Sequence, residues 1–91
     1  MIKLLNNSYE IVKGKENFIE EETNYLFTEY FSVFDYILGD YSCGKLRLKG
    51  FYNSNNKSVK SINDIKILDS YINDYCAPGS KIFLIKKLKN K

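Results

Sequence analysis

The sequence contains no histidine, no tryptophan and a single proline among its 91 residues. Without histidine the chain lacks the most common general base of enzymes and the most common metal ligand of proteins. Its two cysteines, Cys43 and Cys76, lie far apart and match no zinc or redox spacing. We therefore interpret both as free thiols, and we expect a protein that is not an enzyme, with no cofactor, no metal site and no evident small-molecule substrate.

Long hydrophobic runs are also missing. No stretch approaches the roughly 18 to 20 apolar residues that a membrane span requires. The first apolar residues are interrupted at once by Asn6, Asn7 and Ser8, so there is no signal-peptide pattern. We expect a cytoplasmic protein without membrane contact, folded as one domain over residues 1–91, with a basic, frayed C-terminal tail at 87–91.

Charge is distributed unevenly along the chain. The formal net charge is +3, but residues 1–40 are acidic overall, whereas residues 41–91 carry most of the lysines. Such segregation is typical of a surface that binds a polyanion. A compositional bias toward Lys, Asn, Ile and Tyr is an alternative explanation, because it raises the number of lysines everywhere.

The pattern of apolar residues predicts two hairpins, two helices and a final strand. The expected strands cover residues 2–5, 9–13, 35–40, 45–52 and 82–85, and the expected helices begin at Asn17 and Ser61. Residues 53–60 are expected to form a flexible polar loop. This order, ββ-α-ββ-α-β, favours an α+β fold in which two helices pack on one face of a mostly antiparallel sheet.

One long motif resembles the YutD-like family. It runs from Asp35 to Tyr41 and from Gly44 to Tyr52, and the segment from Tyr71 to Cys76 fits the closing region of the same family. The motif positions are Asp35, Gly39, Asp40, Gly44, Leu46, Leu48, Gly50 and Tyr52.

The resemblance implies a small cytosolic protein of low-GC Gram-positive bacteria or their wall-less relatives, with a compact αβ domain and no established activity. The chain departs from the family pattern at two positions. Cys43 stands where an aromatic residue is expected, and Ser80 stands where a second cysteine often follows Cys76. The second departure weakens any redox or metal role for Cys76.

Two carboxylates of this motif are candidates for a catalytic pair. Asp35 and Asp40 are five positions apart, and an odd separation in an extended strand directs two side chains to opposite faces. They are therefore not expected to cooperate. Asp40 is expected instead to form a cross-strand ion pair with Lys45.

The second hairpin strand alternates basic and apolar residues. Leu46 and Leu48 are expected on one face, and Lys45, Arg47 and Lys49 on the other, at the spacing of successive phosphates. The proposed nucleic-acid site adds stacking surfaces and loop lysines to these three residues. The added residues are Tyr41, Phe51, Lys57 and Lys60.

Arg47 is the only arginine in the chain, and its planar guanidinium is suited to bidentate contacts. The alternative is that the basic strand is merely the solvated side of a half-buried sheet. Two functions therefore remain: binding of RNA or the ribosome through the basic strand, or binding of a protein through exposed aromatic residues of the hairpin, namely Tyr36, Tyr41 and Phe51.

Overall fold

The computed structural model describes residues 2–77 and 79–88. Its five strands form one antiparallel sheet in the order β1-β2-β5-β3-β4. The strands are β1 (Ile2–Leu4), β2 (Asn7–Lys13), β3 (Tyr36–Asp40), β4 (Arg47–Phe51) and β5 (Ile82–Lys87). The helices are α1 (Glu20–Leu26), α2 (Glu29–Ser32) and α3 (Leu68–Tyr75). The predicted α+β class and antiparallel sheet are confirmed.

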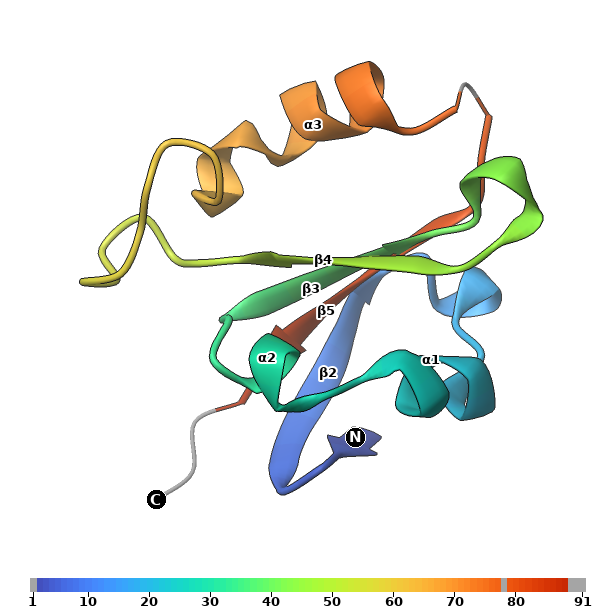
Figure 1. Ribbon diagram of the computed structural model, residues 1–91, viewed down its shortest axis with the longest axis horizontal. Coiled ribbons are helices and arrows are strands. Elements are labelled where there is room, and N and C mark those ends of the chain that lie inside the picture. Colours follow the sequence, from blue (N-terminus) through green and yellow to red (C-terminus); the bar gives the residue numbers. More distant parts are fainter. Residues whose placement is uncertain (1, 78, 89–91) are drawn as a thin grey trace.

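The helices cover both faces of the sheet, with α3 on one side and α1 and α2 on the other (Figure 1). On the α1 side, Ile37 and Phe83 belong to the larger core cluster, which includes Phe27 and Phe34. On the α3 side, Leu38 belongs to a second cluster with residues of α3. The prediction of both helices on one face is therefore wrong, because successive residues of β3 and β5 are apolar and need cover on each face.

The first helical region is shorter and more broken than the periodicity predicts. Asn17 does not cap α1. This residue lies in a 3-10 helix, and its side chain donates to the carbonyl of Ile82 at 2.9 Å. The chain turns extended at Phe27 and Thr28, which separates α1 from α2. Phe27 and Phe34 are both buried in the core under the sheet.

The loop that precedes α3 is held by side-chain hydrogen bonds rather than being a free polar segment. Asp35 Oδ2 accepts bonds from the backbone N–H of Asn53 at 2.8 Å and from the Asn56 side chain at 3.0 Å. Asp64, not Ser61, caps the following 3-10 helix by accepting from Lys66 N–H at 3.0 Å. The prediction that the second helix begins at Ser61 is wrong, since α3 starts at Leu68.

The C-terminal end of the described chain is also ordered. Lys87 is the last residue of β5, and its Nζ donates to the carbonyl of Ser32 at 2.7 Å. Leu88 N–H donates to the carbonyl of Ser8 at 2.8 Å. The predicted frayed tail is therefore wrong for residues 87 and 88, and its remaining residues, 89–91, lie outside the described part of the chain. None of the described helices is long and apolar enough to span a membrane.

Two glycines of the hairpin lie directly beneath phenylalanine rings. A Cβ on Gly39 would lie 2.1 Å from the ring of Phe83, and a Cβ on Gly50 would lie 2.1 Å from the ring of Phe34. Both rings belong to the core on the α1 side. Glycine at these positions therefore allows aromatic rings to rest on the strand backbone.

We expect Gly50→Ala to lower the free energy of unfolding by about 1–3 kcal/mol, because the ring of Phe34 must move to admit the methyl group. Urea unfolding followed by circular dichroism measures this. Gly44→Asn is the control: Gly44 has φ 74° with open space around its Cβ position, and asparagine tolerates that conformation. A Gly50→Ala variant as stable as the parent would contradict the ring contact.

Tyr9 is fully buried on β2, and its ring packs edge-on against Phe27 with the ring centroids 5.6 Å apart. Burial raises the pKa of the Tyr9 hydroxyl to about 12. An unfolded tyrosine ionises near pH 10. The folded protein thus retains this proton over a range of pH in which the unfolded chain loses it.

It follows that Tyr9 contributes stability that is fully present below about pH 10 and is lost between about pH 10 and 12. We expect urea unfolding at several pH values in that range to show a steeper decline for the parent than for Tyr9→Phe. Tyr25→Phe is the control, because Tyr25 is 88% exposed. Equal slopes for parent and Tyr9→Phe would rule out the raised pKa.

Candidate functional site

Asp40 and Arg47 lie directly opposite each other on β3 and β4. Nε and Nη2 of Arg47 approach Asp40 Oδ1 at 3.1 and 3.0 Å. The predicted pair between Asp40 and Lys45 is wrong. A 3-10 helix at Ser42–Gly44 lengthens the turn, so that Arg47 rather than Lys45 reaches the carboxylate.

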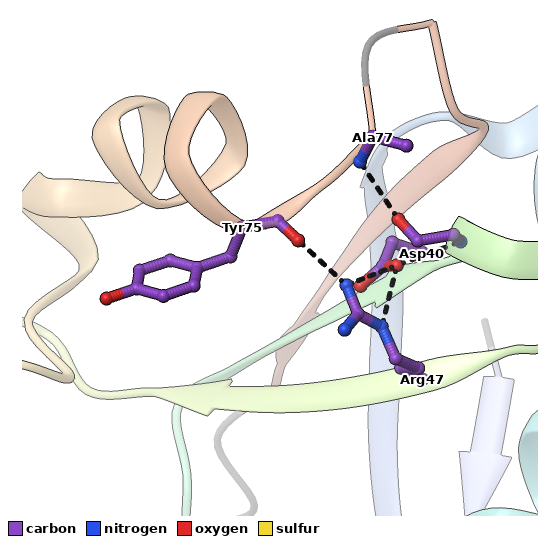
Figure 2. A network of polar contacts seen from close by, with 5 residues as sticks. Asp40, Arg47, Tyr75 and Ala77 are labelled. Atoms are coloured by element: carbon purple, nitrogen blue, oxygen red, sulfur yellow. Dashed lines mark hydrogen bonds and ion pairs between the residues drawn. The ribbon is translucent and has the colours of Figure 1, made fainter.

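Arg47 also connects the hairpin to α3 (Figure 2). Its Nη2 donates to the carbonyl of Tyr75, the last residue of α3, at 3.0 Å. Beside it, Ser42 N–H donates to Asp40 Oδ1 at 3.1 Å, and Ser42 Oγ accepts from Ala77 N–H at 3.1 Å. A cation at a helix C-terminus is favourable, because the carbonyl end of the helix dipole is negative.

The electrostatics of this network favour a fixed ion pair. The hydrogen bond and the charge of Asp40 raise the pKa of Arg47 above its ordinary value. Burial, followed by the charge of Asp40, raises the pKa of the Cys76 thiol. Since the thiolate is the nucleophile, Cys76 is positioned as an inert thiol rather than a reactive one.

The predicted row of basic side chains is not a continuous surface. Arg47 is held by Asp40 and Tyr75, and Lys49 lies against α3, with its Nζ 5.3 Å from the centre of the Phe51 ring and 5.9 Å from that of Tyr71. Lys45 precedes β4 and lines a groove beside α1. The structure therefore does not bring these three residues together.

The other residues of the predicted nucleic-acid site are also separated. Tyr41 packs on the α1 side and donates its hydroxyl to Glu22 at 3.0 Å. Phe51 is 0% exposed, so the prediction that it offers a stacking surface is wrong. Lys57 and Lys60 are exposed in the loop that follows β4. Lys45 lies at the opposite end of that strand.

The two motif carboxylates do not form a pair, as the sequence predicts. Asp40 bonds Arg47 at one end of β3, whereas Asp35 bonds the 53–56 segment just before the other end. Within residues 2–77 and 79–88 there is no group of three His, Cys, Asp or Glu side chains that could hold a metal ion.

The outer edge of β4 is a free row of backbone groups. β4 pairs only with β3. Both backbone groups of Tyr52 point away from β3, because its N–H donates to Asn63 at 2.7 Å and its carbonyl accepts from Ile65 at 2.9 Å. Backbone groups alternate in direction along a strand, so those of Leu48 and Gly50 also point outward. In the described residues no other backbone bonds them.

A groove lies on each side of this edge. The first, of about 610 Å³, we call the acidic groove; it is lined by Glu21, Glu22, Tyr25 and Leu26 of α1 and by Lys45 and Leu46. The second, of about 500 Å³, we call the aromatic groove; it is lined by Lys49, Ile62, Ile67, Tyr71, Asp74 and Tyr75. α1 and α3 lie on opposite sides of β4 in Figure 1.

Sequence reasoning missed the exposed residues of both grooves. Tyr25 is 88% and Tyr75 66% exposed, and Ile62 is exposed as well. Tyr25 falls outside the apolar repeat of its helix, which was an available signal. The sequence spacing predicts Tyr75 on the apolar face of the second helix together with Leu68, but in the structure Tyr75 is exposed. Tyr71 packs on Phe51.

Comparison with known proteins identifies the family of the chain. The model of the family described as "YutD-like: Putative antitoxin YutD-like" matches residues 3–86. The chain belongs to the YutD-like family. This confirms the resemblance carried by the hairpin motif.

YutD of B. subtilis is similar to this chain in both sequence and structure. "Putative antitoxin YutD" of Bacillus subtilis (strain 168) is 36% identical over 90 residues, which is 98% of this chain and 99% of that protein. The solution NMR structure of protein yutD from B. subtilis matches with a TM-score of 0.80 and 35% identity, over 99% of this chain and 83% of that one. The fold is therefore that of a YutD-like protein.

The motif positions that carried the family resemblance have structural roles in the hairpin. Asp40 holds Arg47, Asp35 holds the loop, and Gly39 and Gly50 admit phenylalanine rings. Leu46, Leu48 and Tyr52 pack against the core on the α1 side, and Gly44 has a positive φ. The family motif thus describes how the hairpin is built.

A double-mutant cycle on Asp40→Asn and Arg47→Gln measures the ion pair. We expect a coupling of about 1–2 kcal/mol in the free energy of unfolding, because the carboxylate is buried and bonded by two guanidinium nitrogens. The pair of Asp64 and Lys66 is the control, with an expected coupling below about 0.5 kcal/mol, because its charged atoms are 3.9 Å apart and the Lys66 side chain is 74% exposed. Equal couplings in the two cycles would show that the two short guanidinium contacts to Asp40 add nothing over a single long ion pair.

Proposed function

We propose that the chain acts as an antitoxin-type protein that neutralises a partner protein by binding it. The family description and the name of the B. subtilis relative both include the word antitoxin. Neutralisation by binding requires a surface and no catalytic group. This extends the protein-binding alternative that the sequence left open.

The observation that carries the proposal is the free edge of β4 between two grooves. Exposed apolar residues border it on both sides, with Tyr25 in the acidic groove and Tyr75 and Ile62 in the aromatic groove. Tyrosine is enriched at the centres of protein interfaces, because it buries a large area at little cost in side-chain entropy. The aromatic residues that support protein binding are therefore these, rather than Tyr36, Tyr41 and Phe51.

The competing function, binding of RNA or the ribosome through the basic strand, has less support. Phosphate binding needs cations that are free to release their counterions. Arg47 is neutralised by Asp40, and the nearest lysines, Lys45 and Lys49, lie beside different helices. The acidic residues of α1 next to Lys45 would also repel a polyanion.

Photo-crosslinking in the cells that make the protein tests the proposal. We expect p-benzoylphenylalanine in place of Tyr75 to give one discrete protein adduct, because that ring lies in the aromatic groove. The same group in place of Val12 is the control: Val12 is also exposed, at 49%, but lies on β2, beyond β5 and β3 from the edge. Mass spectrometry identifies the adduct.

Fluorescence anisotropy with labelled single-stranded and hairpin RNA is the companion measurement. We expect no saturable binding at physiological salt. Micromolar binding that weakens with salt, is lost in a folded Lys45→Ala, Arg47→Ala, Lys49→Ala variant and is accompanied by RNA adducts at position 75 would refute the protein-binding function.

A further inference from the structure

We propose that β4 accepts an extended segment of the partner protein as an additional antiparallel strand, and that this segment carries a large apolar residue followed three positions later by lysine or arginine. This inference rests on the proposed function, and it specifies how the partner is bound and what chemistry it presents.

The backbone of β4 supplies the hydrogen bonds. Leu48 and Gly50 each direct an N–H and a carbonyl away from β3, and the segment from Asn63 to Ile65 occupies the edge only at Tyr52. A partner strand beside residues 46–50 would therefore satisfy groups that the chain itself leaves open. Strand addition of this kind gives affinity through the main chain and specificity through alternate side chains.

The acidic groove determines the charge of the partner. Glu21 and Glu22 lie on its α1 wall, and no described ion pair neutralises either one. A partner side chain beside Leu46 that points to the α1 side enters this groove. The two carboxylates outnumber Lys45 in this groove, so charge complementarity favours a lysine or arginine there.

The aromatic groove determines the apolar residue of the partner segment. Tyr71, Tyr75 and Ile62 make most of its wall apolar, and it opens beside Lys49 on the α3 side of β4. Leu46 and Lys49 are three positions apart, so the partner residues beside them point to opposite faces and are separated by about 10 Å. In an antiparallel strand the apolar residue comes first and the basic residue three positions later.

A second copy of the chain does not meet these requirements. Pairing of two β4 edges through Leu48 and Gly50 would place Lys49 or Arg47, and not a large apolar residue, opposite Lys49. Like charges directly opposite each other on neighbouring strands are destabilising. The partner is therefore a different chain.

Selection of a displayed library of random twelve-residue peptides against the whole protein tests the inference. We expect the enriched peptides to share a large apolar residue followed three positions later by lysine or arginine. Amide hydrogen exchange by NMR then locates them. Leu48 and Gly50 should exchange rapidly in the free protein and become protected on binding, whereas Lys49 and Phe51, which bond β3, should be protected throughout.

Substitutions in the grooves separate the two contacts. We expect Tyr75→Ala and Glu21→Lys each to weaken the selected peptides by about tenfold. Val12→Ala and Glu16→Lys are matched controls, because both residues are exposed and lie outside both grooves. Circular dichroism and urea unfolding establish that the variants are folded.

Selection without any binder, or binders that leave the Leu48 and Gly50 amides unprotected, would overturn the strand-addition site. Neither result would decide the protein-binding function, which depends on the cross-linked adduct at position 75. A protein adduct together with unprotected β4 amides would mean that the partner binds the grooves without adding a strand.

Discussion

The position of α3 over the hairpin depends on the buried carboxylate of Asp40. It holds the guanidinium of Arg47, and the same guanidinium holds the last carbonyl of α3. The hairpin turn and the end of the helix are thus joined through one cation, and the aromatic groove has its shape because Tyr71 and Tyr75 are kept beside β4. The sequence alone assigns the charge of Arg47 to an external phosphate. In the structure this charge holds β3 and α3 together.

Strand alternation could be predicted from the sequence, and the structure confirms it: Leu46 and Leu48 pack on one side, and Arg47 and Lys49 lie on the other. Alternation does not show which helices cover each face of the strand. From the sequence, the basic side is interpreted as facing either a bound nucleic acid or solvent, because its residues are polar. The apolar neighbours Ile37 and Leu38 were the available sign that this sheet is covered on both faces, since one of the two must point toward α3.

The candidate site was less predictable than the fold, because it depends on where elements end. One turn of 3-10 helix at Ser42–Gly44 makes Arg47 rather than Lys45 the partner of Asp40, and Tyr75, the last residue of α3, is exposed. Neither boundary has a strong local signal, and the grooves are formed by residues distant in sequence. The hairpin motif, by contrast, is local and contiguous, and it was sufficient to identify the family.

The contacts of Phe83 with Gly39 and of Phe34 with Gly50 have a consequence for sequence change within the family. At each contact, one residue can gain a side chain only if the other loses volume, so the two positions are expected to change together rather than independently. The ring of Phe34 also lies behind Gly50, whose outer backbone groups are free. A compensated pair of changes at positions 34 and 50 would therefore alter the shape of the β4 edge while leaving the core filled, so that this edge can differ between related proteins with the same core.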